Sequence, residues 1–210
     1  MLATKTALLF SPLHHRVTLY FAFSSSLQLN KCRKFRRPII KATRTESKGA
    51  LLGSRAPDFR LVVPLTRKTW EFDDFESHHS LLKGLAVFVM SSNSVVRHQQ
   101  DGPEFIAEET KLFKYPFRYL YDESQGVARA FRVVYKSEFL LYKKDCRKPF
   151  ELVYNGQFDD SRPSNNMRVT GRDLSMAIGS VLILQPLSFV QKRSVGLVRC
   201  MIKWHPEKSM

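Results

Sequence analysis

Cysteine is scarce in this chain, which has only Cys32, Cys146 and Cys200 among its 210 residues. No two of them form a C-x-x-C motif or a metal-ligand spacing. Cys146 and Cys200 could pair only if the fold brought their Cα atoms within about 7 Å, so we expect separate thiols. No glycine-rich phosphate loop occurs either. The sequence therefore predicts no metal site and no bound cofactor.

Long apolar runs are also absent. A membrane-spanning helix needs about 18 or more consecutive apolar residues. The nearest approach is residues 180–190, which Gln185 and Pro186 interrupt. We therefore expect a soluble protein with no membrane partner.

The first 45 residues contain nine basic residues and no acidic one. A serine run at residues 24–26 and a basic cluster at residues 31–37 lie within this segment. An acid-free, serine- and arginine-rich start is typical of an organelle transit peptide, and Ile40-Lys41-Ala42 is a plausible processing site. The segment predicts a disordered transit peptide over residues 1–45 and import into the chloroplast. Mitochondrial import, secretion and a merely basic terminus remain alternatives.

Acidic residues are common after this segment. Residues 46–210 carry 25 basic and 19 acidic side chains, a net charge of +6. No basic stripe interleaved with exposed aromatic residues remains there, which argues against a nucleic-acid partner. Residues 46–210 are expected to form one mildly basic domain.

Strand and helix patterns alternate along this domain. Two short strands around a turn at residues 67–68 predict a hairpin, and residues 85–90 (LAVFVM) have the continuous apolar pattern of a strand buried on both faces. Asp101, Asp122 and Thr170 are candidate helix caps. The other expected elements are a helical turn at 73–75, helices from 103, from 122 and over 170–182, and strands at 117–121, 139–142 and 152–154 around a polar turn at 143–148. This alternation predicts a mixed α/β domain in three layers.

The order of several short motifs resembles the thioredoxin-like proteins grouped with the alkyl hydroperoxide reductase and thiol-specific antioxidant proteins, a peroxiredoxin-like group. The resemblance runs from about residue 53 to residue 206. Its motifs are APDF (56–59), SSN (91–93), DGPEF (101–105), YLYDES (119–124), GQFDDSRP (156–163), VTGRDL (169–174) and IKWHP (202–206). It implies a thioredoxin-like mixed sheet flanked by helices and a thiol-dependent antioxidant or oxidoreductase activity in the plastid. The partner of such an activity would be a thiol reductant.

The departures from this family concern its active site. Members with an intact site have a strand and a Cys-x-x-Cys-Pro motif opening a helix before the SSN strand, whereas here residues 76–84 lead directly into that strand. Members also resemble Cys-Thr-Pro-Glu-Phe, with a cis proline, where this chain has Tyr135, Lys136 and Ser137 before Glu138. Cys146 stands in a turn where glycine is usual. The sequence thus predicts an incomplete thioredoxin-like domain that lacks one central strand and the active-site helix, with a degenerate pocket at Tyr135, Lys136 and Ser137.

The expected activity is consequently impaired. A C-x-x-C at a helix N-terminus lowers the thiol pKa and supplies a resolving cysteine, and neither exists here. The alternatives are a non-catalytic module that binds a protein partner, or an inactive remnant left by exon skipping or gene prediction. Loss of a central strand should also leave the edges of its neighbours unpaired.

Few residues remain as catalytic candidates. Cys146 is a weak one, because Lys144 and Arg147 beside it would depress its thiol pKa, and Cys200 in an apolar stretch is weaker. Asp159 and Asp160 could act as an acid pair, although a structural contact with Arg162 is the more plausible arrangement. The remaining candidates, which we expect to be solvated and not metal ligands, are His78, His79 and His98.

Overall fold

A computed structural model describes residues 19–25, 49–77, 85–96, 98–135, 137–145, 148–161, 165–193 and 201–205. It contains a seven-stranded mixed sheet with the strand order β3-β2-β5-β4-β1-β6-β7. The strands are β1 (Leu19–Ser25), β2 (Arg60–Val62), β3 (Thr69–Glu71), β4 (Leu85–Ser91), β5 (Arg118–Tyr121), β6 (Phe139–Asp145) and β7 (Lys148–Gly156). The helices are α1 (Phe72–Ser77), η1 (Gln99–Asp101), α2 (Pro103–Phe113), α3 (Gly126–Ala130) and α4 (Arg172–Leu182). The predicted α/β architecture is confirmed.

Side chains cover both faces of the sheet. In β4, Phe88 belongs to a core shared with α1, α3 and the β2–β3 hairpin. Its neighbour Val89 faces the opposite side, where Ile106 of α2 packs. Further along that second face, Leu174 and Ala177 of α4 pack on Phe139 and Leu141 of β6. This alternation within one apolar run explains why residues 85–90 show no polar positions.

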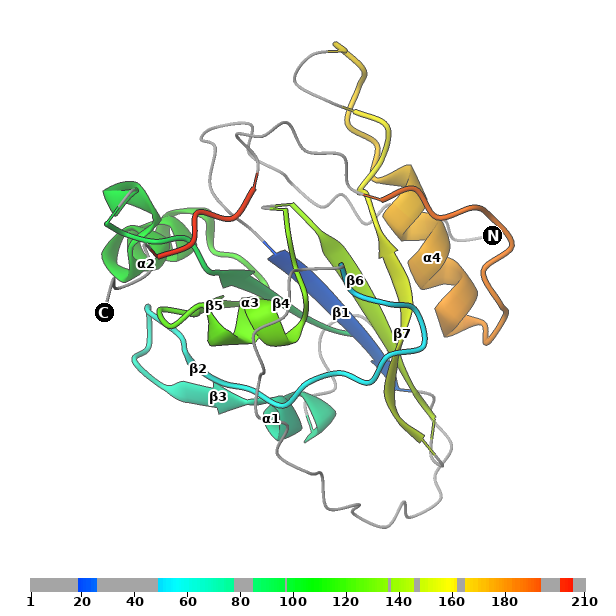
Figure 1. Cartoon of the computed structure of the whole chain (residues 1–210), viewed down its shortest axis with the longest axis horizontal. Coiled ribbons are helices and arrows are strands. Elements are labelled where there is room, and N and C mark those ends of the chain that lie inside the picture. The colour runs from blue at the N-terminus through cyan, green and yellow to red at the C-terminus, as the bar shows by residue number, and fades with distance from the viewer. Residues whose placement is uncertain are drawn as a thin grey trace.

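The middle of the sheet differs from the expectation of a missing central strand. β1, coloured blue in Figure 1, lies between β4 and β6. It comes from the segment that the sequence predicts to be a disordered transit peptide. It pairs antiparallel with β4 and parallel with β6. The edges of β4 and β6 that the sequence leaves unpaired are therefore both paired.

β1 differs in direction from the strand that the family resemblance implies before β4. A strand joined to β4 through one helix would form a crossover unit and run parallel to β4. β1 runs antiparallel to β4. β1 therefore differs from that strand in chain direction, and it comes from a segment whose residues lie more than sixty positions before their partners in β4.

Three local predictions need correction. The polar turn predicted at residues 143–148 is shorter, because β6 continues to Asp145, which pairs with Lys148 of β7. Asp101 does not cap α2, since Gly102 precedes that helix and Asp101 instead accepts a hydrogen bond from Asn93. Gly171, in the left-handed region with φ of 63°, is the N-cap of α4 in place of Thr170.

Within the described ranges, no helix has both the length and the apolar character needed to cross a membrane.

Candidate functional site at the strand ends

Buried polar residues gather where β4 and β5 end. These two strands are parallel, so their carboxyl ends meet at one edge of the sheet, the usual place for a ligand site in an α/β fold. We call this group, together with the half-buried His205 beside it, the strand-end cluster. Its buried members are Ser92, Asn93, Ser94, Asp101, Asp122 and Gln125.

Asp122 is the carboxylate at the centre of the cluster. It is fully buried, and its Oδ2 accepts the N–H of Ala128 in α3 at 2.9 Å and the hydroxyl of Ser92 at 3.2 Å. Its Oδ1 accepts the hydroxyl of Ser124 at 3.1 Å. Asp122 therefore holds the first turn of α3 against the end of β4. The predicted N-cap at this residue needs correction, because the N-cap of α3 is Gln125.

Two amide side chains bind the C-terminal segment, residues 201–205. The Nε2 of Gln125 donates to the backbone oxygens of Ser92 at 2.6 Å and Lys203 at 2.8 Å, while its Oε1 accepts the N–H of His205 at 2.7 Å. The Oδ1 of Asn93 accepts the N–H of Lys203 at 2.9 Å. Both amides are buried. The C-terminal segment is thus fixed across the strand ends by hydrogen bonds removed from water.

Ser94 and His205 form the pair in this cluster that most resembles a nucleophile and its base. The Nε2 of His205 lies 2.8 Å from the backbone oxygen of Glu123, which can only accept. In the neutral ring, Nε2 therefore carries the proton, and Nδ1 accepts from the hydroxyl of Ser94 at 2.9 Å. A nucleophile must reach its substrate, and Ser94 has 0% of its surface exposed. In this arrangement the pair holds the C-terminal segment in place.

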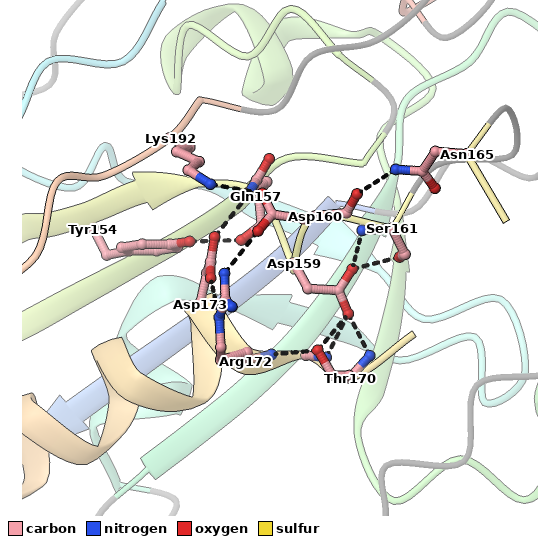
Figure 2. A network of polar contacts seen from close by, with 11 residues as sticks. Tyr154, Gln157, Asp159, Asp160, Ser161, Asn165, Thr170, Arg172, Asp173 and Lys192 are labelled. Carbon is pink, nitrogen blue, oxygen red and sulfur yellow. Dashed lines mark hydrogen bonds and ion pairs between the residues drawn. The ribbon is translucent and has the colours of Figure 1, made fainter. Parts of the chain in front are cut away.

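A second polar network surrounds Asp159 at the start of α4 (Figure 2). Its carboxylate accepts the backbone N–H groups of Ser161 at 2.9 Å, Gly171 at 2.6 Å and Thr170. Burial alone would raise the pKa of Asp159, but the hydrogen bonds from Ser161, Gly171 and Thr170 outweigh it and hold that pKa well below its usual range.

Asp160 belongs to the same network but points to other partners. Its carboxylate accepts hydrogen bonds from the side chains of Lys192 at 2.8 Å, Gln157 at 2.8 Å and Arg172 at 2.7 Å. The hydrogen bonds from Lys192 and Gln157 are the main reasons why its pKa falls to about 2. A general acid or base works best when its pKa lies near the operating pH. Both carboxyls therefore stay ionised at neutral pH, and the two residues act as structural contacts. Within the described residues, the arginine that binds Asp160 is Arg172.

Asp159→Asn should destabilise the protein at pH 7 by about 2 kcal/mol, the scale of hydrogen bonds to a charged group. The unfolded pKa of an aspartate is about 3.9, and the folded pKa of Asp159 is lower. The stabilising contribution is therefore complete above the unfolded pKa and is lost as the pH falls through the folded pKa. We expect the difference in unfolding free energy between the two proteins to shrink from about pH 5 to pH 2, measured by urea denaturation.

Glu108→Gln is the matched control, because Glu108 is an exposed carboxylate on α2. Its unfolding free energy should stay close to that of the wild type at each pH. A pH-independent difference between wild type and Asp159→Asn would contradict the role assigned to the Asp159 carboxylate.

The predicted degenerate pocket belongs to the stretch of chain between α3 and β6. Tyr135 is half-buried and forms a β-bridge with Met201, and Ser137 is exposed. Backbone N–H groups of Val134 and Tyr135 donate to Glu138 Oε2 at 3.0 and 3.4 Å. Burial raises the pKa of Glu138, although these hydrogen bonds oppose the rise. The described residues contain no cis peptide bond, and Lys136, the middle residue of the predicted pocket, lies outside them.

Several candidate residues lie outside the described part of the chain: Lys136, Cys146, Cys200, His78, His79 and Arg162. His98 is described and is exposed. In the part of the chain that the structure describes, no three His, Cys, Asp or Glu residues are grouped as a metal site would require. The sequence analysis missed Gln125, Asn93 and His205, because single amide and imidazole side chains in loops carry no periodic signal.

Comparisons with known proteins place the chain among uncharacterised relatives. No family model matches it, and no curated protein does. A hypothetical protein from Sinorhizobium meliloti 1021 shares 32% identity with it at a TM-score of 0.66, over 77% of this chain and 99% of that protein. An uncharacterised conserved protein from Geobacillus kaustophilus shares 30% identity at a TM-score of 0.67, over 80% of this chain and 100% of that protein. The chain therefore belongs to the same protein family as these two bacterial proteins.

Proposed function

We propose that this protein is a plastid member of the thioredoxin-like, thiol-specific antioxidant group that no longer performs thiol–disulfide exchange and acts by binding a protein partner. The resemblance of the motifs between residues 53 and 206 supports the kinship. The absence of a C-x-x-C motif from the sequence supports the loss of activity.

The observation that carries this proposal is the position of the C-terminal segment. In a strand–helix–strand unit the helix begins at the carboxyl end of its first strand, beside the carboxyl end of the parallel second strand. A thiol helix placed before β4 would therefore open beside Ser92, Asn93 and Ser94. Those residues are buried, and Asn93 binds the backbone of Lys203 at 2.9 Å. The C-terminal segment occupies the edge at which thiol chemistry would take place.

The degenerate pocket supports the same proposal. A cis proline beside a cysteine pair is a costly feature that shapes the substrate site. Ser137 takes that position here and is exposed, while the neighbouring Tyr135 is engaged in a bridge with Met201. Neither residue is a cysteine that could take part in thiol–disulfide exchange.

The test is an assay of the full chain for thiol-dependent reduction of peroxide and of insulin disulfides. We expect the rate of each reaction to equal the rate without protein, because the sequence has no C-x-x-C motif whose second cysteine would resolve a mixed disulfide. Cys146→Ser and Cys200→Ser should leave both rates unchanged. Turnover by the wild type that disappears in Cys146→Ser would overturn the proposal and identify Cys146 as a nucleophile.

A further inference from the structure

The place between β4 and β6 is a slot for one extended strand. β4 pairs with β5 on its other side, and β6 pairs with β7 on its other side. Each of the two strands therefore turns one row of backbone N–H and C=O groups toward the slot. β1 satisfies these rows through six residue pairs with β4 and six with β6.

The walls of the slot are apolar on both faces of the sheet. Phe21 of β1 lies in register between Phe88 and Leu140, which both belong to the core on the α3 side. The next residue, Ala22, lies between Val87 and Leu141, which pack in the core under α4. Successive positions of any strand in the slot therefore face alternate cores, so a suitable strand is apolar at every position rather than at every second one.

The sequence of β1 meets this requirement. Its first five residues, LYFAF, carry no charge and no proline. The two serines that follow pair with Lys143 and Lys144 at the end of β6, beyond the fully buried part of that strand. Residues 20–23 of β1 thus lie beside the buried part of β6, and its two serines lie beside the less buried end.

The link between β1 and the rest of the sheet contains the predicted processing site. Residues 26–48 connect β1 to the segment that begins at Gly49, and Ile40-Lys41-Ala42 lies within this connection. Cutting the chain there removes none of the residue pairs that hold β1 in the slot.

We propose that the slot between β4 and β6 is a strand-binding site whose ligand is residues 19–25 of the same chain. Backbone pairing with β4 and β6 holds this strand, and the covalent connection is dispensable once it is bound. A chain cut at the processing site then keeps its N-terminal piece as a second polypeptide in the centre of the sheet. The inference does not depend on the proposed function.

Engineered disulfides test the register and the direction of the bound strand. In the full chain with Cys32, Cys146 and Cys200 replaced by serine, the pair Ala22→Cys and Val87→Cys should crosslink under mild oxidation, because these residues are direct partners. The matched control is Ser24→Cys with Val87→Cys. Ser24 pairs with Leu85, so it lies about two residues, roughly 7 Å, further along the strand, beyond disulfide reach.

We expect most of the first variant to form an intrachain disulfide and the control to remain reduced. Equal crosslinking of the two variants, or crosslinks only between separate chains, would overturn the proposal.

In a second experiment, the recognition sequence of a site-specific protease is inserted after Ile40 of the full chain. After complete cleavage, the two pieces should elute together in size-exclusion chromatography. Separation of the pieces, or aggregation on cleavage, would refute the claim that the cut strand stays bound.

Discussion

Ala22→Pro should lower the free energy of unfolding by about 3 kcal/mol or more. A strand with a neighbour on each side directs every backbone N–H toward one of them, and Ala22 lies between Val87 of β4 and Leu141 of β6. Proline lacks this N–H and is confined to edge strands and bulges. A proline inside a helix costs about 3 kcal/mol or more, and a comparable loss here is a large share of a total stability of about 5–15 kcal/mol.

Urea denaturation followed by circular dichroism measures this effect. Thr6→Pro is the matched control, because it places proline in the same N-terminal segment but outside β1. We expect the control to unfold at the wild-type midpoint and Ala22→Pro to unfold at a much lower one. Coincident unfolding curves for wild type and Ala22→Pro would show that β1 does not contribute to the folded sheet.

β1 was also the element that sequence reasoning could not place. The residues LYFAFSS lie in an acid-free segment, and this composition predicts a transit peptide. Their partners in β4 and β6 are more than sixty positions away in the chain. The resemblance predicts that a central strand is missing, but local composition contains no information about which distant segment takes its place.

Elements with strong local patterns were predicted well. The unbroken apolar run at residues 85–90 forms β4, and the helix expected over 170–182 is α4 (Arg172–Leu182), on which Leu174, Ala177 and Val181 are buried. Boundaries and caps were predicted less well where another group competes. Asn93 takes the carboxylate of Asp101 at 2.6 Å, so that side chain is no longer available to the helix it precedes.

The candidate site was predicted only in part. An aspartate just before an apolar helical pattern predicts that Asp122 caps a helix, but α3 begins at Gly126 and its N-cap is Gln125. The carboxylate of Asp122 still accepts the N–H of Ala128 in the first turn of that helix. The C-terminal segment held by Asn93 and Gln125 comes from residues 78 to 110 positions away. A single sequence gives no signal for hydrogen bonds over that separation.

Asp122→Ala should cause the largest loss of stability among changes in the strand-end cluster. The carboxylate has no exposed surface, and its removal leaves the N–H of Ala128 and the hydroxyl of Ser92 without this acceptor. An unsatisfied buried polar group costs about 1–3 kcal/mol, so the two together predict a loss of about 3–5 kcal/mol. The unfolding free energy of the full chain in urea is the measurement.

Two further variants make this prediction specific to the carboxylate. Asp122→Asn keeps one acceptor oxygen and should fall between wild type and Asp122→Ala. Glu123→Ala changes the adjacent, exposed side chain and leaves the backbone oxygen that binds His205 in place, so its stability should stay within about 0.5 kcal/mol of wild type. If Asp122→Ala were no less stable than Glu123→Ala, the strand ends would be held mainly by Gln125 and Asn93.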